Sequence, residues 1–159
     1  MHHFESDKIR NVVLLSHSGA GKTSLAEAAL FDAQATTRLG NVTDGTTVSD
    51  HDPEEIKRQI SINLSLVPCQ LKDAKINLID TPGYPDFIAE VKEGVRVSEG
   101  AIIVVSAASG VEVGTEQAWE KVSNAGIPSL VFVNKMDREN TNHSDAIKNI
   151  QANISEKCI

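Results

Sequence analysis

Apolar residues in this chain form continuous runs that alternate with stretches in which they recur every three or four positions. The continuous runs predict buried strands at residues 9–15, 101–105 and 130–133, and a further strand is predicted at 75–80. Helices are predicted at 24–30, which is rich in strong helix formers, and at 87–95, 112–125 and 145–157, where apolar residues share one face. This alternation predicts an α/β fold with a mostly parallel sheet that is covered on both faces.

The remaining stretches predict further details of the secondary structure. Alternating apolar and polar residues predict a half-exposed strand at 60–66, joined to the next strand as a hairpin by a turn at 72–73. Residues 34–58 show no periodicity, which predicts a long loop that is functional or disordered. Ser144 is expected to cap the last helix. The helix at 112–125 is expected to place Ala118, Trp119, Val122 and Ala125 on one side, with Trp119 as a core anchor.

Three polar segments follow three of the predicted strands. Residues 16–23 follow the first strand, 80–83 the third and 134–137 the fifth. Ligands of open α/β sheets bind beyond the carboxyl ends of the strands. We therefore expect these distant segments to lie together in space and to form one binding site.

The first segment ends in Gly21-Lys22-Thr23, which matches the second half of the phosphate-binding loop pattern, although Ser16 replaces its leading glycine. Backbone N–H groups between residues 18 and 23 can converge on an anion at the start of the following helix. Lys22 would then reach the terminal phosphates, and the Thr23 hydroxyl would bind magnesium. The alternative for this segment alone is an ordinary glycine-rich turn between a strand and a helix.

The other two segments suggest a guanine nucleotide and its metal ion. The Asp137 carboxylate can accept two hydrogen bonds that guanine donates and adenine does not, while Lys135 lies over the purine and Asn134 ties its loop to the phosphate loop. Asp80 would hold magnesium through water, and Ser61 would offer a second hydroxyl ligand. The alternatives are a solvated strand end at 134–137, a turn before Pro82 and a polar surface residue at Ser61.

Composition narrows the class of protein. The 159 residues suit one domain, and 40% hydrophobic and 23% charged residues are typical of a soluble protein. A net charge of −7 argues against a broad nucleic-acid-binding surface. No apolar run has the length of a membrane span, so no membrane partner is expected. Cys69 and Cys158 are expected to be reduced thiols, which favours a cytoplasmic protein.

Four segments, at residues 16–24, 58–62, 80–87 and 134–138, resemble the GTPase domain of translational GTPases, most closely elongation factor G and its paralogues. The resemblance covers nearly the whole chain, and the segments occur in the family's order. It implies a three-layer phosphate-loop GTPase fold that binds GTP or GDP with Mg²⁺. It also implies that the intact protein docks on the ribosome and hydrolyses GTP during translocation or ribosome recycling.

The resemblance also assigns roles to individual residues. It implies that Lys22, Gly83 and Tyr84 act in hydrolysis and that Thr23, Ser61 and Asp80 hold the metal ion. The implied nucleotide-binding residues are Ser16, His17, Ser18, Gly19, Ala20, Gly21, Lys22, Thr23, Ser24, Asp80, Thr81, Pro82, Gly83, Tyr84, Asn134, Lys135, Met136 and Asp137.

The chain departs from the family at four positions. Ser16 would strain or redirect the phosphate loop if that position needs a glycine conformation. Gln59 replaces a glycine near Ser61, which itself replaces a threonine. Tyr84 stands where most of the family has the histidine that positions the attacking water, and a phenol is a poor base at neutral pH. We therefore expect nucleotide binding to be better preserved than fast turnover, and Tyr84 points towards the elongation factor G-like paralogues.

The last guanine-binding motif of the family and its sixth strand have no counterpart in the sequence. Residues 1–159 are therefore expected to be the N-terminal part of one GTP-binding domain, with an exposed edge at 130–133 through which copies associate. One alternative is a nucleotide-binding module with little catalysis. Another is a release-factor or ribosome-protection relative, and a third, an unrelated phosphate-loop kinase or ATPase, is opposed by residues 134–137.

Overall fold

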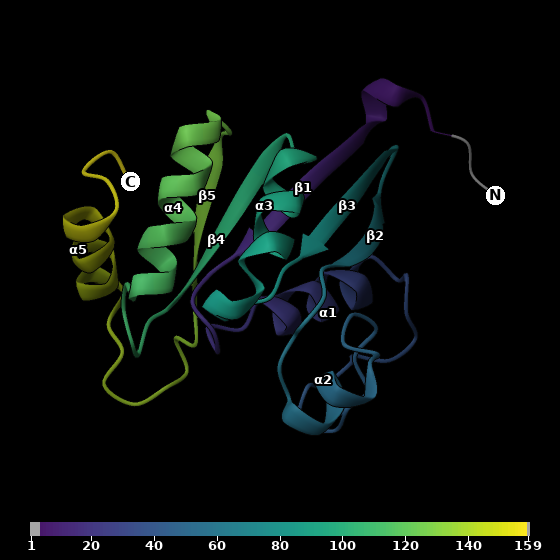
Figure 1. The fold of residues 1–159 in the computed structure, drawn as a ribbon, viewed down its shortest axis with the longest axis horizontal. Coiled ribbons are helices and arrows are strands. Elements are labelled where there is room, and N and C mark those ends of the chain that lie inside the picture. The colour runs from purple at the N-terminus through teal and green to yellow at the C-terminus, as the bar shows by residue number, and fades with distance from the viewer. Residues whose placement is uncertain (1–3, 159) are drawn as a thin grey trace.

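Five strands form one sheet in the computed structural model, which describes residues 4–158 (Figure 1). The strands are β1 (Ile9–Leu15), β2 (Ser65–Leu71), β3 (Ala74–Asp80), β4 (Gly100–Ser106) and β5 (Ser129–Asn134). They lie in the order β2-β3-β1-β4-β5, and only the β2–β3 hairpin is antiparallel. The carboxyl ends of β1, β3, β4 and β5 therefore share one edge of the sheet, as the apolar pattern predicts.

Helices cover both faces of this sheet. Those that pack on the strands are α1 (Lys22–Asp32), α3 (Ile88–Arg96), α4 (Val113–Ala125) and α5 (His143–Asn153). The short helix α2 (Pro53–Arg58) lies away from the sheet (Figure 1), and there are 3₁₀ turns at Ser6–Lys8 and Pro85–Phe87. Leu14 of the central strand packs with α1, whereas its neighbours Val13 and Leu15 pack with α3 and α4. Successive side chains of a strand point to opposite faces, so β1 is buried on both sides and anchors the site at its carboxyl end.

A third apolar cluster joins α5 to the outer strands. Ile103 and Val105 of β4 pack there with Ile150 of α5, and Trp119 of α4 lies half-buried against them. Trp119 is thus a core residue, as expected. Ala125, at the last position of α4, is exposed instead of sharing the buried side, because the helix ends there at Gly126.

The alternation at residues 60–66 is misleading, because β2 begins only at Ser65. The backbone N–H groups of Ile62 and Asn63 donate to the buried Glu55 carboxylate instead of to a neighbouring strand. The loop expected at 34–58 also contains a helix, α2. The Asp52 cap, Pro53 in the first turn and the reciprocal bond that the Asp52 N–H donates to the Glu55 side chain are helix-start signals that the absence of periodicity concealed.

Several helix ends differ from the expectation. The α1 helix starts at Lys22, two residues before Ser24, because the phosphate loop leads directly into it. The Asn142 side chain, which accepts from the Ser144 N–H at 2.8 Å, caps α5 in place of Ser144. This helix ends at Asn153, well before residue 157. Phe87 belongs to a 3₁₀ turn that precedes α3.

The β5 strand forms one edge of the sheet and pairs only with β4 among the described residues. Leu130 is 59% exposed on this strand, and Phe132 is also exposed. Residues 4–158 contain no sixth strand. The association of copies through this edge stays a prediction. None of the helices that the structure describes is both long and apolar enough to cross a membrane.

Candidate functional site

The three polar segments that follow β1, β3 and β5 lie around one cleft at the carboxyl edge of the sheet. Its volume is about 410 Å³, within the range of small-ligand sites. Predicted residues that line it are Ser18, Gly19, Gly21, Lys22, Thr23, Ser24, Ser61, Gly83, Tyr84 and Lys135. Val42, Thr43, Asp50, Gln59, Ile60 and Arg138 line it as well. Of the other predicted residues, Ser16, His17, Ala20, Asp80, Thr81, Pro82, Asn134, Met136 and Asp137 lie outside this lining.

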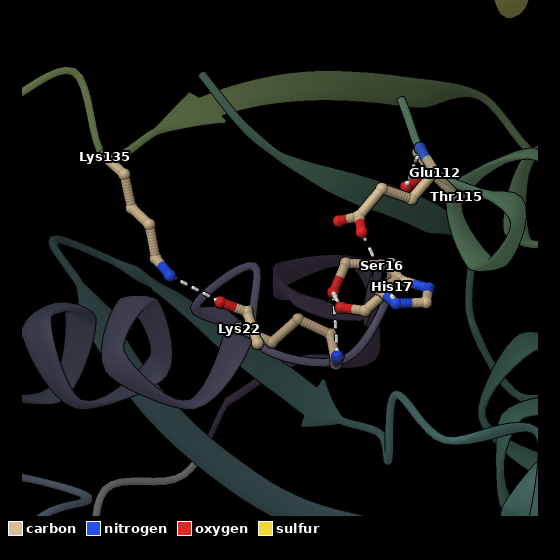
Figure 2. A network of polar contacts seen from close by, with 7 residues as sticks. Ser16, His17, Lys22, Glu112, Thr115 and Lys135 are labelled. Atoms are coloured by element: carbon tan, nitrogen blue, oxygen red, sulfur yellow. Dashed lines mark hydrogen bonds and ion pairs between the residues drawn. The ribbon is translucent and has the colours of Figure 1, made fainter. Parts of the chain in front are cut away.

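The phosphate loop is tied to the loop after β5 by two hydrogen bonds. Asn134 Nδ2 donates to the Ala20 carbonyl at 2.9 Å, and Lys135 Nζ donates to the Gly19 carbonyl at 2.7 Å. Figure 2 shows Lys135 reaching the loop from the end of β5. Gly21 has a φ of 101°, and a Cβ there would overlap the Asn134 side chain. Only glycine therefore allows both the turn into α1 and this close approach.

Lys22 is the buried cation of the cleft, with 6% of its surface exposed. Its Nζ donates to Ser16 Oγ at 2.8 Å (Figure 2). Burial lowers the pKa of Lys22, and the nearby carboxylates of Asp80 and Asp50 oppose this shift. Ser16 is not among the residues with positive φ. The position therefore needs no glycine conformation, and the serine adds a partner for Lys22 without straining the loop.

Three oxygen-bearing side chains meet behind Lys22. The Thr23 hydroxyl donates to Asp80 Oδ2 at 2.8 Å and lies 3.1 Å from the Ser61 hydroxyl. Asp80 is 1% exposed, and its Oδ1 has no hydrogen-bond partner among the described residues. Burial raises the pKa of Asp80 to about 6, although Lys22 and Thr23 oppose the shift.

This group of oxygens fits a magnesium ion. Mg²⁺ is a hard cation that takes oxygen ligands, few of them from protein carboxylates when phosphates are present. A buried carboxylate oxygen without a partner is unusual and calls for a water or an ion. Within residues 4–158 no cluster of three or more His, Cys, Asp or Glu offers a competing metal site.

The segment after β3 packs directly on the phosphate loop. The buried Thr81 hydroxyl donates to the Leu14 carbonyl at 2.7 Å, which fixes the segment to β1. A Cβ on Gly83 would lie 2.7 Å from Ser18 Cα and 2.8 Å from Lys22 Nζ, so there is no room for a side chain. Tyr84 follows at the lip of the cleft with 40% of its surface exposed.

The base-binding loop is more open. Met136 and Asp137 are exposed, and only Lys135 and Arg138 of this loop line the cleft. His17 is directed to the α4 side of the phosphate loop, where its Nε2 lies 3.6 Å from Glu112 Oε1 (Figure 2). Gly114 also packs closely against His17. His17 therefore supports the phosphate loop from the α4 side and does not line the cleft.

Asp50 is the main site residue that sequence reasoning missed. It is buried and lines the cleft. Burial raises its pKa, and the Ser61 hydroxyl opposes the shift. The only sequence signal was the length of the loop that contains it. Gln59, which the sequence marks only as the replacement of a glycine, also lines the cleft and has a φ of 55°. This left-handed backbone explains why a glycine suits the same place in the family.

A mostly parallel sheet with a lysine-bearing glycine loop, a hydroxyl–carboxylate group and an Asn-Lys-x-Asp loop at one edge defines a phosphate-loop GTPase domain. The chain belongs to the elongation factor Tu GTP binding domain family, whose sequence profile matches residues 7–159.

Relatives of the chain include translation factors. It is 40% identical over 151 residues to the elongation factor G-like protein of Mycobacterium tuberculosis, covering 95% of this chain and 21% of that protein. It is 40% identical over 148 residues to the mitochondrial ribosome-releasing factor 2 of Schizosaccharomyces pombe, covering 93% of this chain and 18% of that protein. Elongation factor G 2 of Streptomyces coelicolor is 42% identical over 146 residues, which cover 92% of this chain and 21% of that protein.

A crystal structure of a protein from Thermus thermophilus has the same fold, with a TM-score of 0.89 and 34% sequence identity. The match covers 93% of this chain and 22% of that chain. The chain thus spans about a fifth of the length of its relatives.

Proposed function

We propose that the chain binds GTP and GDP with Mg²⁺ and hydrolyses GTP as part of an elongation factor G-type translation factor. The observation that carries this proposal is the group formed by Thr23, Ser61 and Asp80 beside Lys22. Its hydroxyls and partnerless carboxylate oxygen suit a cation, and the adjacent buried ammonium suits a phosphate.

Different residues of the chain bind the phosphates and the metal ion. The amides of the phosphate loop and Lys22 would hold the phosphate oxygens, Thr23 and Ser61 would be the hydroxyl ligands of Mg²⁺, and Asp80 would hold the ion through water. Mg²⁺ bound there would supply positive charge beside the terminal phosphates. Gly83 packs against Lys22 and the phosphate loop, so its N–H is suited to sensing a third phosphate.

Base selection belongs to the loop after β5. Asn134 fixes this loop to the phosphate loop, as its bond to Ala20 supports. The Lys135 stem covers the purine, and Asp137 accepts hydrogen bonds from guanine. A base without these donors leaves the carboxylate unpaired, and this cost favours GTP over ATP.

Tyr84 favours a second candidate function, a nucleotide-binding module with little turnover. Its phenol lies at the lip of the cleft, and a phenol is a weaker general base than the imidazole of a histidine. Phosphoryl transfer depends mainly on positioning and electrostatics, so slow hydrolysis is still expected. The ribosome is the proposed partner of the intact protein, in translocation or recycling, and the cytoplasm is its proposed compartment.

Single-turnover GTP hydrolysis with and without ribosomes tests this proposal. The Tyr84→His variant is expected to hydrolyse GTP at least about tenfold faster than the wild-type chain, since a positioned base adds roughly 10²–10⁴-fold. Tyr84→Phe is the matched control, because it keeps the ring and removes only the hydroxyl. If wild type and Tyr84→His bind GTP but neither hydrolyses it on ribosomes, the binding-module function is correct instead.

A further inference from the structure

The segment between residues 48 and 63 brings both Asp50 and Ser61 to the cleft, yet most of it lies outside helix and strand. Its one regular element is the short helix α2. Something other than a sheet must therefore hold the two side chains in place, and two buried glutamates contact the segment at its two ends.

Glu27 contacts the first end. It lies on α1, the helix that also carries Lys22 and Thr23, and is 1% exposed. Its Oε1 accepts the Val48 N–H at 2.6 Å and the Ser49 N–H at 3.4 Å. These are the two residues before Asp50. The carboxylate thus joins the backbone next to Asp50 to the helix that begins the phosphate site.

Glu55 contacts the second end in a similar way. It lies on α2 and is also 1% exposed. Its Oε1 accepts the N–H groups of Ile62 at 2.9 Å and Asn63 at 3.0 Å, the two residues after Ser61. Its Oε2 accepts the Asp52 N–H at 3.1 Å. One side chain therefore fixes both α2 and the backbone that presents Ser61.

We propose that Glu27 and Glu55 are positioning residues of the cleft that holds the metal site, Glu27 for Asp50, which lines the cleft, and Glu55 for the metal ligand Ser61. Each carboxylate accepts two consecutive backbone N–H groups beside the residue that it positions. Hydrogen bonds to an ionised acceptor are stronger than those between neutral groups, and buried N–H groups left without a partner carry a large penalty. The proposal rests on the proposed function, because it concerns how this chain holds Mg²⁺.

The negative charges of Glu27 and Glu55 also favour a cation near Asp50. Glu55 and Glu27 are close enough to Asp50 to raise its pKa alongside the effect of burial. Two further carboxylates thus add negative charge near Asp50, which lines the cleft, and a cation there relieves their mutual repulsion. Loss of either glutamate removes both a backbone anchor and part of the negative charge that favours the ion.

The test uses Glu27→Gln and Glu55→Gln, with Glu54→Gln as the matched control. Glu54 neighbours Glu55 on α2 but is exposed and pairs only with Lys57 and Arg58 at the surface among the described residues, apart from its backbone bond to Asp52. Two readouts are needed. Amide hydrogen exchange without nucleotide or metal reports the anchors at residues 48–49 and 62–63. The Mg²⁺ concentration that halves the release rate of a fluorescent GDP analogue reports the metal site.

We expect each Gln variant to lose protection at its own anchor only and to need at least about tenfold more Mg²⁺, the usual cost of losing a residue that orients a metal ligand. Glu54→Gln should match the wild-type chain in both readouts. If Glu55→Gln does not fold, Glu55→Asp, which keeps the charge on a shorter stem, is expected to show the same pair of changes.

Lost protection without a change in the Mg²⁺ requirement would overturn the proposal, since the glutamates would then be purely structural. Unchanged protection would also overturn it. A wild-type chain whose GDP release does not respond to Mg²⁺ would instead refute the proposed function, so the two failures are distinguishable.

Discussion

The two ends of the proposed nucleotide cleft differ in how far the protein alone has built them. At the phosphate end, Lys22, Thr23 and Asp80 are buried and already joined to one another or to the phosphate loop by hydrogen bonds. At the base end, Asn134 and Lys135 tie the start of the loop to the phosphate loop, but Met136 and Asp137 are exposed. The phosphate end is therefore more fully preorganised than the base end.

This difference indicates where binding energy comes from. A charge-assisted hydrogen bond contributes more in a buried site than in water, because the local dielectric constant is lower. Contacts with phosphate and metal should therefore dominate affinity, while Asp137 should mainly adjust the choice of base. Substitutions at the two ends are expected to differ accordingly in size and in kind.

The largest effect is expected for Lys22→Ala. Removing the buried ammonium should weaken GDP and GTP binding by about 100-fold, since a hydrogen bond to a charged group is worth roughly 1.5–3 kcal/mol. Titration with a fluorescent GDP analogue measures this loss of affinity. The control is Lys148→Ala, an exposed lysine on α5 that pairs with Asp145. An affinity within twofold of the wild-type chain would show that Lys22 does not bind phosphate.

A smaller effect is expected for Asp137→Ala. Its carboxylate is exposed, so we expect the preference for GDP over ADP to fall by about tenfold with little change in ADP affinity. Competition against the same fluorescent analogue gives both constants. Glu139→Ala, which removes an exposed charge from the same loop, should leave the preference intact. Equal losses in the two variants would mean that overall charge, not guanine recognition, sets the effect.

The smallest effect concerns Glu55, which supports the backbone beside Ser61, and it appears as a pH dependence of the stability of the folded chain. Burial works to raise the pKa of Glu55, but hydrogen bonds donated by Asn63, Ile62 and Asp52 outweigh it and leave the pKa below its usual value of 4.5. A lowered folded-state pKa stabilises the protein above the unfolded value, and this stabilisation is lost as the pH falls below it.

Thermal unfolding between about pH 6 and pH 3 checks this pH dependence. The melting temperature of the wild-type chain should fall more steeply than that of Glu55→Gln, which no longer titrates there. Glu54→Gln should keep the wild-type slope. Identical slopes for the wild-type chain and Glu55→Gln would contradict the role given to the buried carboxylate.

The sequence predicts the parts of the site whose signals are local. Two short segments, Gly21-Lys22-Thr23 and Asn134-Lys135-Met136-Asp137, each follow the end of a predicted strand and consist of neighbouring residues. A few consecutive positions therefore predict both where each segment lies and what it binds. The mostly parallel sheet is also predictable, because each apolar run is a local signal, and the structure confirms this sheet. Whether the predicted residues carry out their assigned roles stays a prediction that the substitutions above test.

Other features depend on contacts between distant residues. Asp50 reaches the cleft because Glu27 holds the backbone beside it, and these residues are far apart in sequence. The false strand at 60–66 depends on a shorter-range contact, since Glu55, seven and eight residues before Ile62 and Asn63, takes the N–H groups that a strand would use. The α2 helix is different, because Asp52, Pro53 and Glu55 form a start signal that the sequence already contains.

Displacement of a bound fluorescent GDP analogue by GTP, GDP and ATP in the presence of Mg²⁺ tests the central claim most directly. If the three segments enclose a guanine nucleotide and its cation, GTP and GDP should displace the analogue at concentrations at least about tenfold lower than ATP. Removal of Mg²⁺ should also speed release of the analogue. Equal displacement by ATP and GTP, with no response to Mg²⁺, would contradict the account.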